Sequence, residues 1–258
     1  MKENRKEKYR IRAKRKNFIR KIILLMMILT ITFFVLTKTG FFNVSSIKVL
    51  GNESISREEI IKRSGIAMGQ NYFSVSKKDR VEAINSIAKI KSSKIKFSVS
   101  GDTTIEVVER KGIMQIENYA SYYIIDRDLR IIEIMSRPFQ NLKDIKGVNI
   151  QNLDLGDYIL TKEKDKREFL AQLIDTEEIF NSIKGIEFKE DMYVLMDNND
   201  VEIQFNSIED LEYKFRMLVE ILKDIETTNK NAIRIEMDNG YSPIVVLQST
   251  YDEKENND

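Results

Sequence analysis

The run from Ile22 to Thr37 is sixteen residues long and carries no charge, and it constrains the chain more than any other feature. As a helix it extends roughly 24 Å, so flanking residues up to Gly40 are needed to cross a hydrocarbon core about 30 Å thick. The run is apolar on every face, whereas a helix of a soluble core is apolar on one face. We therefore predict a transmembrane signal anchor over residues 22–40.

A cleaved signal peptide is the alternative, because it shares a basic arm followed by an apolar centre. Cleavage requires small residues after the apolar run. Here the run is followed by Lys38 and by the bulky pair Phe41 and Phe42, so the sequence favours an anchor that is retained.

Charge predicts the orientation of this anchor. Residues 1–21 form a basic arm with eleven Lys and Arg against two Glu, a net charge of +9. Because the whole chain carries +1, residues 22–258 carry −8. The positive-inside rule then places the arm in the cytoplasm and the bulk of the chain outside the cytoplasmic (inner) membrane. Topology and attraction to anionic lipids explain the arm, so we expect no nucleic-acid partner.

The chain has no cysteine and no histidine. A disulfide scaffold, a thiolate metal site and any triad that contains histidine are therefore excluded. Carboxylate pairs remain possible, but the candidates stand at turns, where Asp is favoured for its local hydrogen bonds; they are Asp126, Asp128, Asp197, Asp200 and Asp238. We predict that the protein is not an enzyme and has no catalytic residues, cofactor, metal or small-molecule substrate.

After the anchor, the pattern of apolar residues predicts the order β-α-α-β-β. The expected elements are a strand Val44–Leu50, a helix capped by Ser56 with Glu59, a second helix from Ser76, and strands Lys94–Val99 and Thr104–Arg110. Alternation of apolar and polar residues in the strand Lys94–Val99 directs Ile95, Phe97 and Val99 inward.

Particular residues along these elements resemble a POTRA domain. They are Phe42, Val44, Ile47, Val49, Gly51, Asn52, Ile55, Ser56, Glu59 and Ile60, then Ser64-Gly65-Ile66, Gly69, Asn71 and Phe73, and finally Ile105, Val107, Glu109 and Arg110. A POTRA domain directly after one signal anchor is similar to the FtsQ/DivIB family of bacterial cell-division proteins. Lys111 stands where family members often carry proline. The resemblance implies a POTRA domain at 42–111 and an FtsQ/DivIB-type β domain at 112–248.

The second half of the chain reads as strands with two helices. We expect one helix over Lys166–Ile183 and a longer one capped by Ser207, whose apolar face packs on a sheet rather than in a coiled coil. The last strands are Ala232–Met237 and Tyr241–Gln248, and residues 249–258 form an acidic tail that we expect to be disordered. The predicted fold class is α+β, with one N-terminal transmembrane helix, a POTRA domain, and a mostly antiparallel β domain with two packed helices.

The strand Tyr241–Gln248 is the candidate edge of the second sheet. Pro243 favours an edge or a strand start, and an exposed edge accepts an added strand from a partner; the alternative is an interior pair. The family's final strand pair is matched by Ile233, Ile235, Gly240 and Val245. The resemblance implies that the bitopic partner of the FtsB/DivIC type binds at this edge, through Met237, Asn239, Tyr241, Ile244, Val245 and Val246. It also implies that an FtsL-type partner is held as the other member of a coiled-coil pair. The strand register stays open by a residue or two.

Together these features predict a non-catalytic scaffold of the divisome. It would be a single-pass protein at the division septum that helps regulate septal peptidoglycan synthesis. Two alternatives remain open. One is a POTRA-containing component of protein assembly or secretion, and the other is an extracytoplasmic hydrolase that uses carboxylates.

Overall fold

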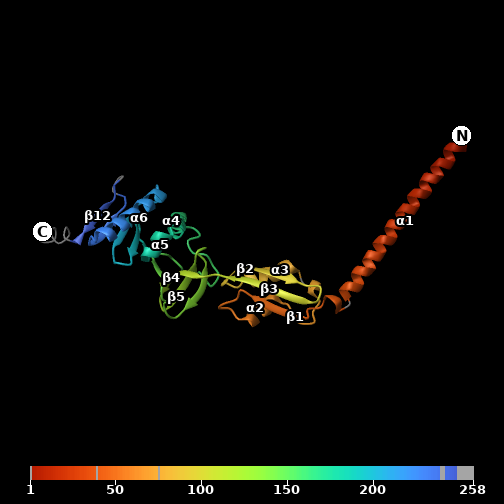
Figure 1. Ribbon diagram of the computed structural model, residues 1–258, viewed down its shortest axis with the longest axis horizontal. Helices are drawn as coiled ribbons and strands as arrows, with labels where there is room; N and C mark the ends of the chain where they lie inside the picture. The colour runs from red at the N-terminus through yellow and green to blue at the C-terminus, as the bar shows by residue number, and fades with distance from the viewer. Residues whose placement is uncertain (1, 39, 75, 239–241, 249–258) are drawn as a thin grey trace. The chain divides into compact units, whose positions relative to one another are not determined.

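The computed structural model describes residues 2–38, 40–74, 76–238 and 242–248 (Figure 1). Contacts divide the chain into two compact units. The first ends at Glu109, and the second begins at Arg110 and also takes in Ile87–Lys89. The division lies two residues before the boundary that the sequence predicts.

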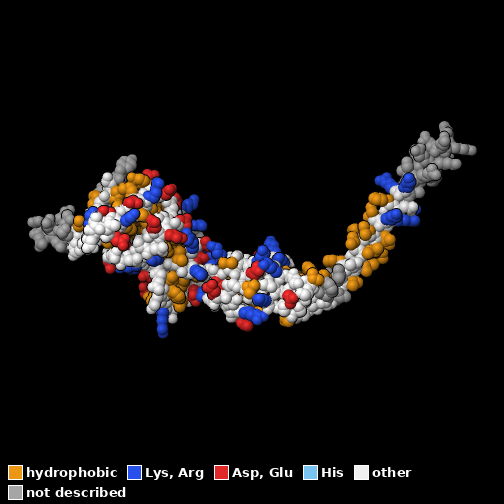
Figure 2. Space-filling model, viewed as in Figure 1, with side chains coloured by type: hydrophobic (Ala, Val, Ile, Leu, Met, Phe, Trp, Pro, Cys, Tyr) orange, Lys and Arg blue, Asp and Glu red, His pale blue; other side chains and the backbone are white. Residues whose placement is uncertain are grey.

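Helix α1 (Lys2–Lys38) contains the predicted anchor. Its stretch Lys14–Val35 has a mean hydropathy of 2.2 and is not buried by the rest of the protein, which is consistent with a single membrane span. Figure 2 shows hydrophobic side chains along this helix and basic ones towards its start. The helix extends well before residue 22, because Lys and Arg are good helix formers. A 3₁₀ turn, η1 (Gly40–Phe42), follows it.

The rest of the first unit has the predicted β-α-α-β-β order. Its elements are β1 (Ser46–Leu50), α2 (Arg57–Ser64), the 3₁₀ turn η2 (Tyr72–Ser74), α3 (Lys77–Asn85), β2 (Ile90–Phe97) and β3 (Asp102–Glu109). The strands lie in the order β1-β3-β2, with β1 parallel and β2 antiparallel to β3. This is the arrangement expected of a POTRA fold, and it confirms the fold class for this unit.

Local sequence signals account for the helix ends in this unit. The Ser56 hydroxyl accepts a hydrogen bond from the Glu59 amide at 3.2 Å, and Gly65 ends α2 in the left-handed region. The inward position expected for Val99 is wrong. Strand β2 ends at Phe97, and Val99 lies in the following turn with 67% of its surface exposed.

Two residues of the POTRA-like pattern hold the turn after β1. Gly51 has φ +82°, and a Cβ there would lie 2.1 Å from the Val107 carbonyl oxygen, so only glycine fits. The Glu109 carboxylate accepts hydrogen bonds from three consecutive amides, those of Glu53, Ser54 and Ile55. Burial raises the pKa of Glu109, but these hydrogen bonds and that from the Ser54 hydroxyl outweigh it, and the net pKa is lowered.

The second unit is built on a nine-stranded sheet within the described residues. Its strands are β4 (Gly112–Asn118), β5 (Ser121–Asp126), β6 (Ile131–Met135), β7 (Lys143–Lys146), β8 (Ile183–Phe188), β9 (Tyr193–Asp197), β10 (Glu202–Phe205), β11 (Ala232–Glu236) and β12 (Ile244–Leu247). They lie in the order β12-β11-β10-β9-β8-β7-β4-β5-β6. Five of the eight strand pairs are antiparallel, as expected of a mostly antiparallel domain.

Helices in the described part of this unit number three rather than the predicted two. They are α4 (Lys164–Asp175), α5 (Glu177–Ser182) and α6 (Leu211–Thr228). The first predicted helix is broken at Thr176, whose φ and ψ of −90° and 77° are not helical. Ser207 is not the cap of α6. Its hydroxyl accepts from the Glu209 amide in a local turn, and α6 begins after Asp210.

The core of the second unit lies between one face of the sheet and these helices. Phe169 of α4 is fully buried and contacts four aromatic rings from two strand pairs and α6; they are Phe188, Tyr193, Phe205 and Phe215. Helix α6 buries Leu211, Phe215 and Leu218 in the same cluster. The apolar stripe of α6 therefore packs on the sheet, as the sequence predicts.

We expect Glu109→Gln to destabilise the first unit by about 1–2 kcal/mol, because an amide oxygen is a weaker acceptor than a carboxylate. Since the folded-state pKa of Glu109 is lowered, its stabilisation is present above the ordinary glutamate pKa and is lost as the pH falls through the lower folded value. Urea unfolding of the full chain at several pH values measures both effects. The exposed Glu82→Gln variant is the control, and an acid dependence shared by Glu109→Gln and the unsubstituted protein would contradict the assignment.

Candidate partner-binding edge

Strand β12 lies at one end of the nine-stranded sheet, as the sequence predicts for an edge. It is antiparallel to β11, with Arg234 opposite Val246 and Glu236 opposite Ile244. Pro243 immediately precedes the strand, where a missing amide hydrogen interrupts no ladder. Within the described residues, no strand pairs with the other side of β12.

The direction of the main-chain groups of β12 follows from two hydrogen bonds. The Met237 amide donates to the Gln204 carbonyl at 2.9 Å, so alternation turns the groups of Arg234 and Glu236 towards β12. The Gln248 amide donates to the Asn231 carbonyl at 3.0 Å, so Gln248 faces β11 and the preceding residue, Leu247, faces away from it. The hydrogen bonds at both ends of β11 therefore give the same alternation along β12. Val245 and Leu247 therefore direct their amide and carbonyl groups to the open side of the strand.

The side chains of β12 divide between two faces of the sheet. Val245 and Leu247 pack against the core cluster. Because successive residues of a strand point to opposite faces, Ile244 and Val246 lie on the face away from the helices, beside Arg234 and Glu236. Ile244 keeps 42% of its surface exposed. The edge thus combines open main-chain groups with an exposed Ile244 and a half-buried Val246.

The structure separates the six residues predicted for the interface. Ile244 and Val246 are on the accessible face, and Val245 offers its main chain while its side chain faces the core. Met237 is only 2% exposed and belongs to the core, because alternation along β11 turns it towards the helices. Asn239 and Tyr241 lie outside the described residues. Sequence reasoning missed Leu247, since a run of four apolar residues carries no sign of which ones point inward.

The opposite end of the same sheet is covered at the start of its edge strand, β6. Beyond β6, the Ile131 amide donates to Asp157 at 2.8 Å, and the Gly156 amide donates to Ile131 at 2.9 Å. The Ile159 amide donates to Leu129 at 2.9 Å. A loop therefore occupies the outward main-chain groups of Leu129 and Ile131 at the start of β6, which is a common way to protect part of a sheet edge. The two ends of the sheet differ in their capacity to accept another strand.

A charged contact anchors the start of the β11–β12 connection. The Lys214 ammonium of α6 pairs with Asp238, and both side chains are only 12–13% exposed. Asp238 also accepts from the Asn206 amide at 2.6 Å. A cavity of about 700 Å³ adjoins this pair and reaches Pro243. Asp238 therefore does more than form a turn, because it connects β11 to α6 and to the end of β10.

The other aspartates also have structural partners. Asp126 and Asp128 contact the same Arg110 nitrogen at 2.5 and 2.7 Å, and the Arg110 side chain is 8% exposed. Burial lowers the pKa of Arg110, but the hydrogen bonds that it donates to Asp126 and Asp128 outweigh this effect, and the net pKa is raised. Asp200 pairs with Lys184. These contacts account for the carboxylates without catalysis.

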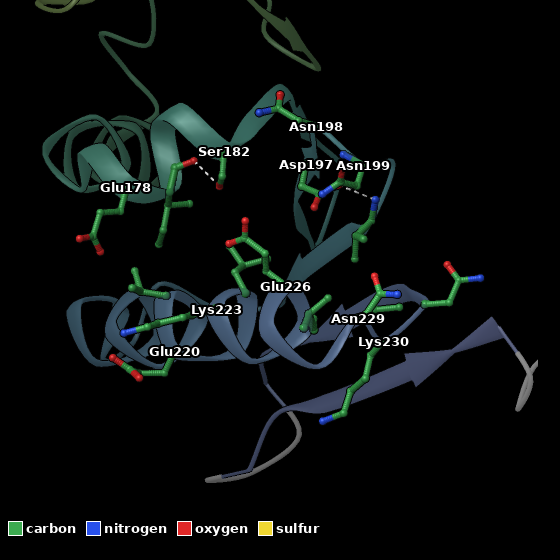
Figure 3. Close-up of a pocket in the computed structure, with 17 residues that line it drawn as sticks. Glu178, Ser182, Asp197, Asn198, Asn199, Glu220, Lys223, Glu226, Asn229 and Lys230 are labelled. Carbon is green, nitrogen blue, oxygen red and sulfur yellow. Dashed lines mark hydrogen bonds between the residues drawn. The ribbon is translucent and has the colours of Figure 1, made fainter.

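A second cavity, of about 860 Å³, lies between α5, α6 and the β9–β10 turn (Figure 3). Asp197 lines it, but its Oδ1 accepts from the Asn199 and Val201 amides at 2.8 and 2.7 Å, so this atom closes the turn. Asp238 lines the first cavity instead. The described residues contain no group of three or more acidic, His or Cys side chains placed to hold a metal.

Comparison with known proteins bears on this architecture. Residues 42–110 match the family described as "POTRA domain, FtsQ-type". The chain is 26% identical over 200 residues to Cell division protein DivIB of Clostridium botulinum (strain Loch Maree / Type A3), covering 76% of this chain and 70% of that relative. It is 30% identical over 159 residues to Cell division protein DivIB of Clostridium tetani (strain Massachusetts / E88), covering 60% and 58%.

The FtsQ-type POTRA match and these relatives support the FtsQ/DivIB family for this chain. The DivIB of Clostridium botulinum (strain Hall / ATCC 3502 / NCTC 13319 / Type A) is 27% identical over 164 residues, and 62% of each chain is covered. The chain therefore spans between about three fifths and 70% of the lengths of these relatives. The FtsQ-type match ends at Arg110, the residue that begins the second unit.

We expect Lys214→Met to lower the stability of the second unit by about 2–3 kcal/mol, because it leaves the mostly buried Asp238 without its cation. Hydrogen exchange should rise in the amides of β11 and β12 that face one another. Lys230→Met is the matched control, since the Lys230–Asp224 pair is about half exposed and should contribute less than about 1 kcal/mol. An equal loss of stability in the two variants would contradict an anchoring role for the Lys214–Asp238 pair.

Proposed function

We propose that this protein is a non-catalytic scaffold of the bacterial divisome that captures a partner strand on β12. The support is the contrast between the two ends of the nine-stranded sheet. At the start of β6 a loop takes up the amide and carbonyl of Ile131, whereas at β12 Val245 and Leu247 offer theirs within the described residues. Such an edge accepts an extended segment through main-chain hydrogen bonds.

The side chains beside the edge indicate what kind of segment would fit. An added strand would place alternate residues next to Ile244 and Val246, so apolar side chains are expected there. Arg234 and Glu236 lie on β11, one strand further from the edge, and carry opposite charges. Long polar side chains of the partner that reach across β12 could therefore be of either charge. The family resemblance suggests FtsB/DivIC-type partners for this strand, with FtsL-type proteins in the same assembly.

Topology and location belong to the same proposal. The name shared by the clostridial relatives, Cell division protein DivIB, supports a role in cell division. With α1 as a retained anchor, the basic arm would lie in the cytoplasm, and the part of the first unit after α1 and the whole second unit would lie outside. The protein would act at the septum in regulating peptidoglycan synthesis. These relatives favour this role over assembly or secretion, and the structural partners of the aspartates leave the hydrolase alternative without a site.

We expect Ile244→Lys in the full chain to weaken binding of the external segment of a DivIC-type partner at least about tenfold, a loss of about 1.4 kcal/mol. Ile134→Lys is the matched control, because Ile134 is in β6 at the opposite end of the sheet and is 38% exposed, against 42% for Ile244. Isothermal titration on protein in nanodiscs measures both. Unchanged binding by Ile244→Lys, or an equal loss in the two variants, would refute the β12 interface. A charged residue at Val245 is a poor test, because this side chain packs on the core.

A fluorescent fusion of the full chain should concentrate at midcell in dividing cells. The Ile244→Lys variant tests whether partner capture contributes to this localisation. Uniform staining of the membrane by the unsubstituted fusion would contradict the division role itself.

A further inference from the structure

The end of the first unit that follows α1 exposes large apolar side chains. Met68, Phe73 and Val99 have exposed fractions of 61%, 60% and 67%. They belong to two loops, one between α2 and α3 and the other between β2 and β3. Figure 2 shows hydrophobic side chains gathered at this end of the unit. Apolar groups on adjacent loops, rather than scattered singly, indicate a surface that meets something other than water.

Both loops are hydrogen-bonded to the chain just after α1. The Val44 amide donates to Gln70 at 2.9 Å, and the Gly69 amide donates back to Val44 at 2.8 Å. The Ser45 amide donates to the carbonyl of Gly101 at 2.9 Å. Five residues separate Lys38, the last residue of α1, from Val44, and the six steps between them reach at most about 20 Å. Chain length alone therefore keeps these loops near the point where α1 leaves a membrane.

Aromatic rings from three segments pack together beneath the exposed side chains and hold Phe73 in place. The Phe73 ring lies 5.1 Å from Phe42 and 5.5 Å from Tyr72, and Tyr72 stacks on Phe97 at 4.2 Å, measured between centroids. The first two residues of α3, Lys77 and Lys78, are exposed directly after this loop.

This composition matches the boundary of a bilayer. Aromatic side chains favour the headgroup level, and lysines next to it are attracted to anionic lipids.

We propose that Met68, Phe73 and Val99 form a membrane-facing surface that rests in the interface of the bilayer that α1 spans. The occupant is phospholipid, because the surface lies within reach of the anchor and combines apolar tips with adjacent lysines. The inference rests on the proposed membrane topology but not on the β12 edge. It assigns to the first unit a second attachment to the membrane, which would restrict how far the unit can tilt on its tether.

Tryptophan fluorescence tests this contact without background, because the chain contains no tryptophan. Phe73→Trp and Val99→Trp are each introduced into the full chain. Each variant is reconstituted in vesicles of phosphatidylcholine and phosphatidylglycerol, with or without bromine on the acyl chains. Brominated lipid should lower the emission of both variants at least about twofold, because an interfacial indole lies at the boundary of headgroups and acyl chains.

Two controls separate the possible failures. Val108 is 54% exposed and lies towards the far end of β3, about 20 Å along the strand from Asp102. Brominated lipid should therefore leave the emission of the Val108→Trp variant unchanged. Phe33→Trp lies within the apolar stretch of α1 and should be quenched.

Quenching of Phe33→Trp without quenching of Phe73→Trp and Val99→Trp would overturn the membrane-facing surface and leave the anchor intact. Emission of these two variants that is shielded from aqueous iodide but insensitive to bromine would also overturn it, by indicating a protein partner or a second copy. An unquenched Phe33→Trp variant would remove the span and the proposed topology with it.

Discussion

Main-chain hydrogen bonding at the two ends of the nine-stranded sheet is the constraint on which this protein depends. Every strand in the interior of a sheet has its amides and carbonyls paired, whereas a terminal strand leaves half of them open. The loop that carries Gly156 and Asp157 takes up the main-chain groups of Ile131 at the start of β6. In β12, successive residues direct their main-chain groups to opposite sides of the strand, and those of Val245 and Leu247 point away from β11. The proposed partner site is therefore the open side of β12 rather than a pocket.

Two neighbouring charged residues mark the division between the units, and each serves one of them. The Glu109 carboxylate ends the first unit by binding the three amides of the turn after β1. The next side chain, Arg110, is buried in the second unit between Asp126 and Asp128. A Glu-Arg pair that the sequence presents as a family pattern is thus explained by folding. Neither residue needs a role in catalysis or binding.

Strong local signals in the sequence predicted much of the fold. Ser56 and Gly65 bound α2 because a hydroxyl cap and a left-handed C-terminal residue act within one turn of chain. Strand β7 was not predicted, since only Ile145 is buried among its four residues and its neighbours in the sheet are distant in sequence. The break at Thr176 and the late start of α6 were also missed, because the apolar spacing continues across both positions.

The sequence by itself determined the apolar span, the charge asymmetry across it, the order of elements in the POTRA unit and the presence of a final strand pair, because each of these is a periodicity or a composition of contiguous residues. Only the tertiary structure decided that Met237 is buried, that Val246 lies on the face away from the helices, and that, within the described residues, β12 has an open side while a loop covers the start of β6. These depend on the register between β11 and β12 and on a loop more than twenty residues beyond β6. Register and edge protection arise from pairing between distant segments, which local sequence does not encode.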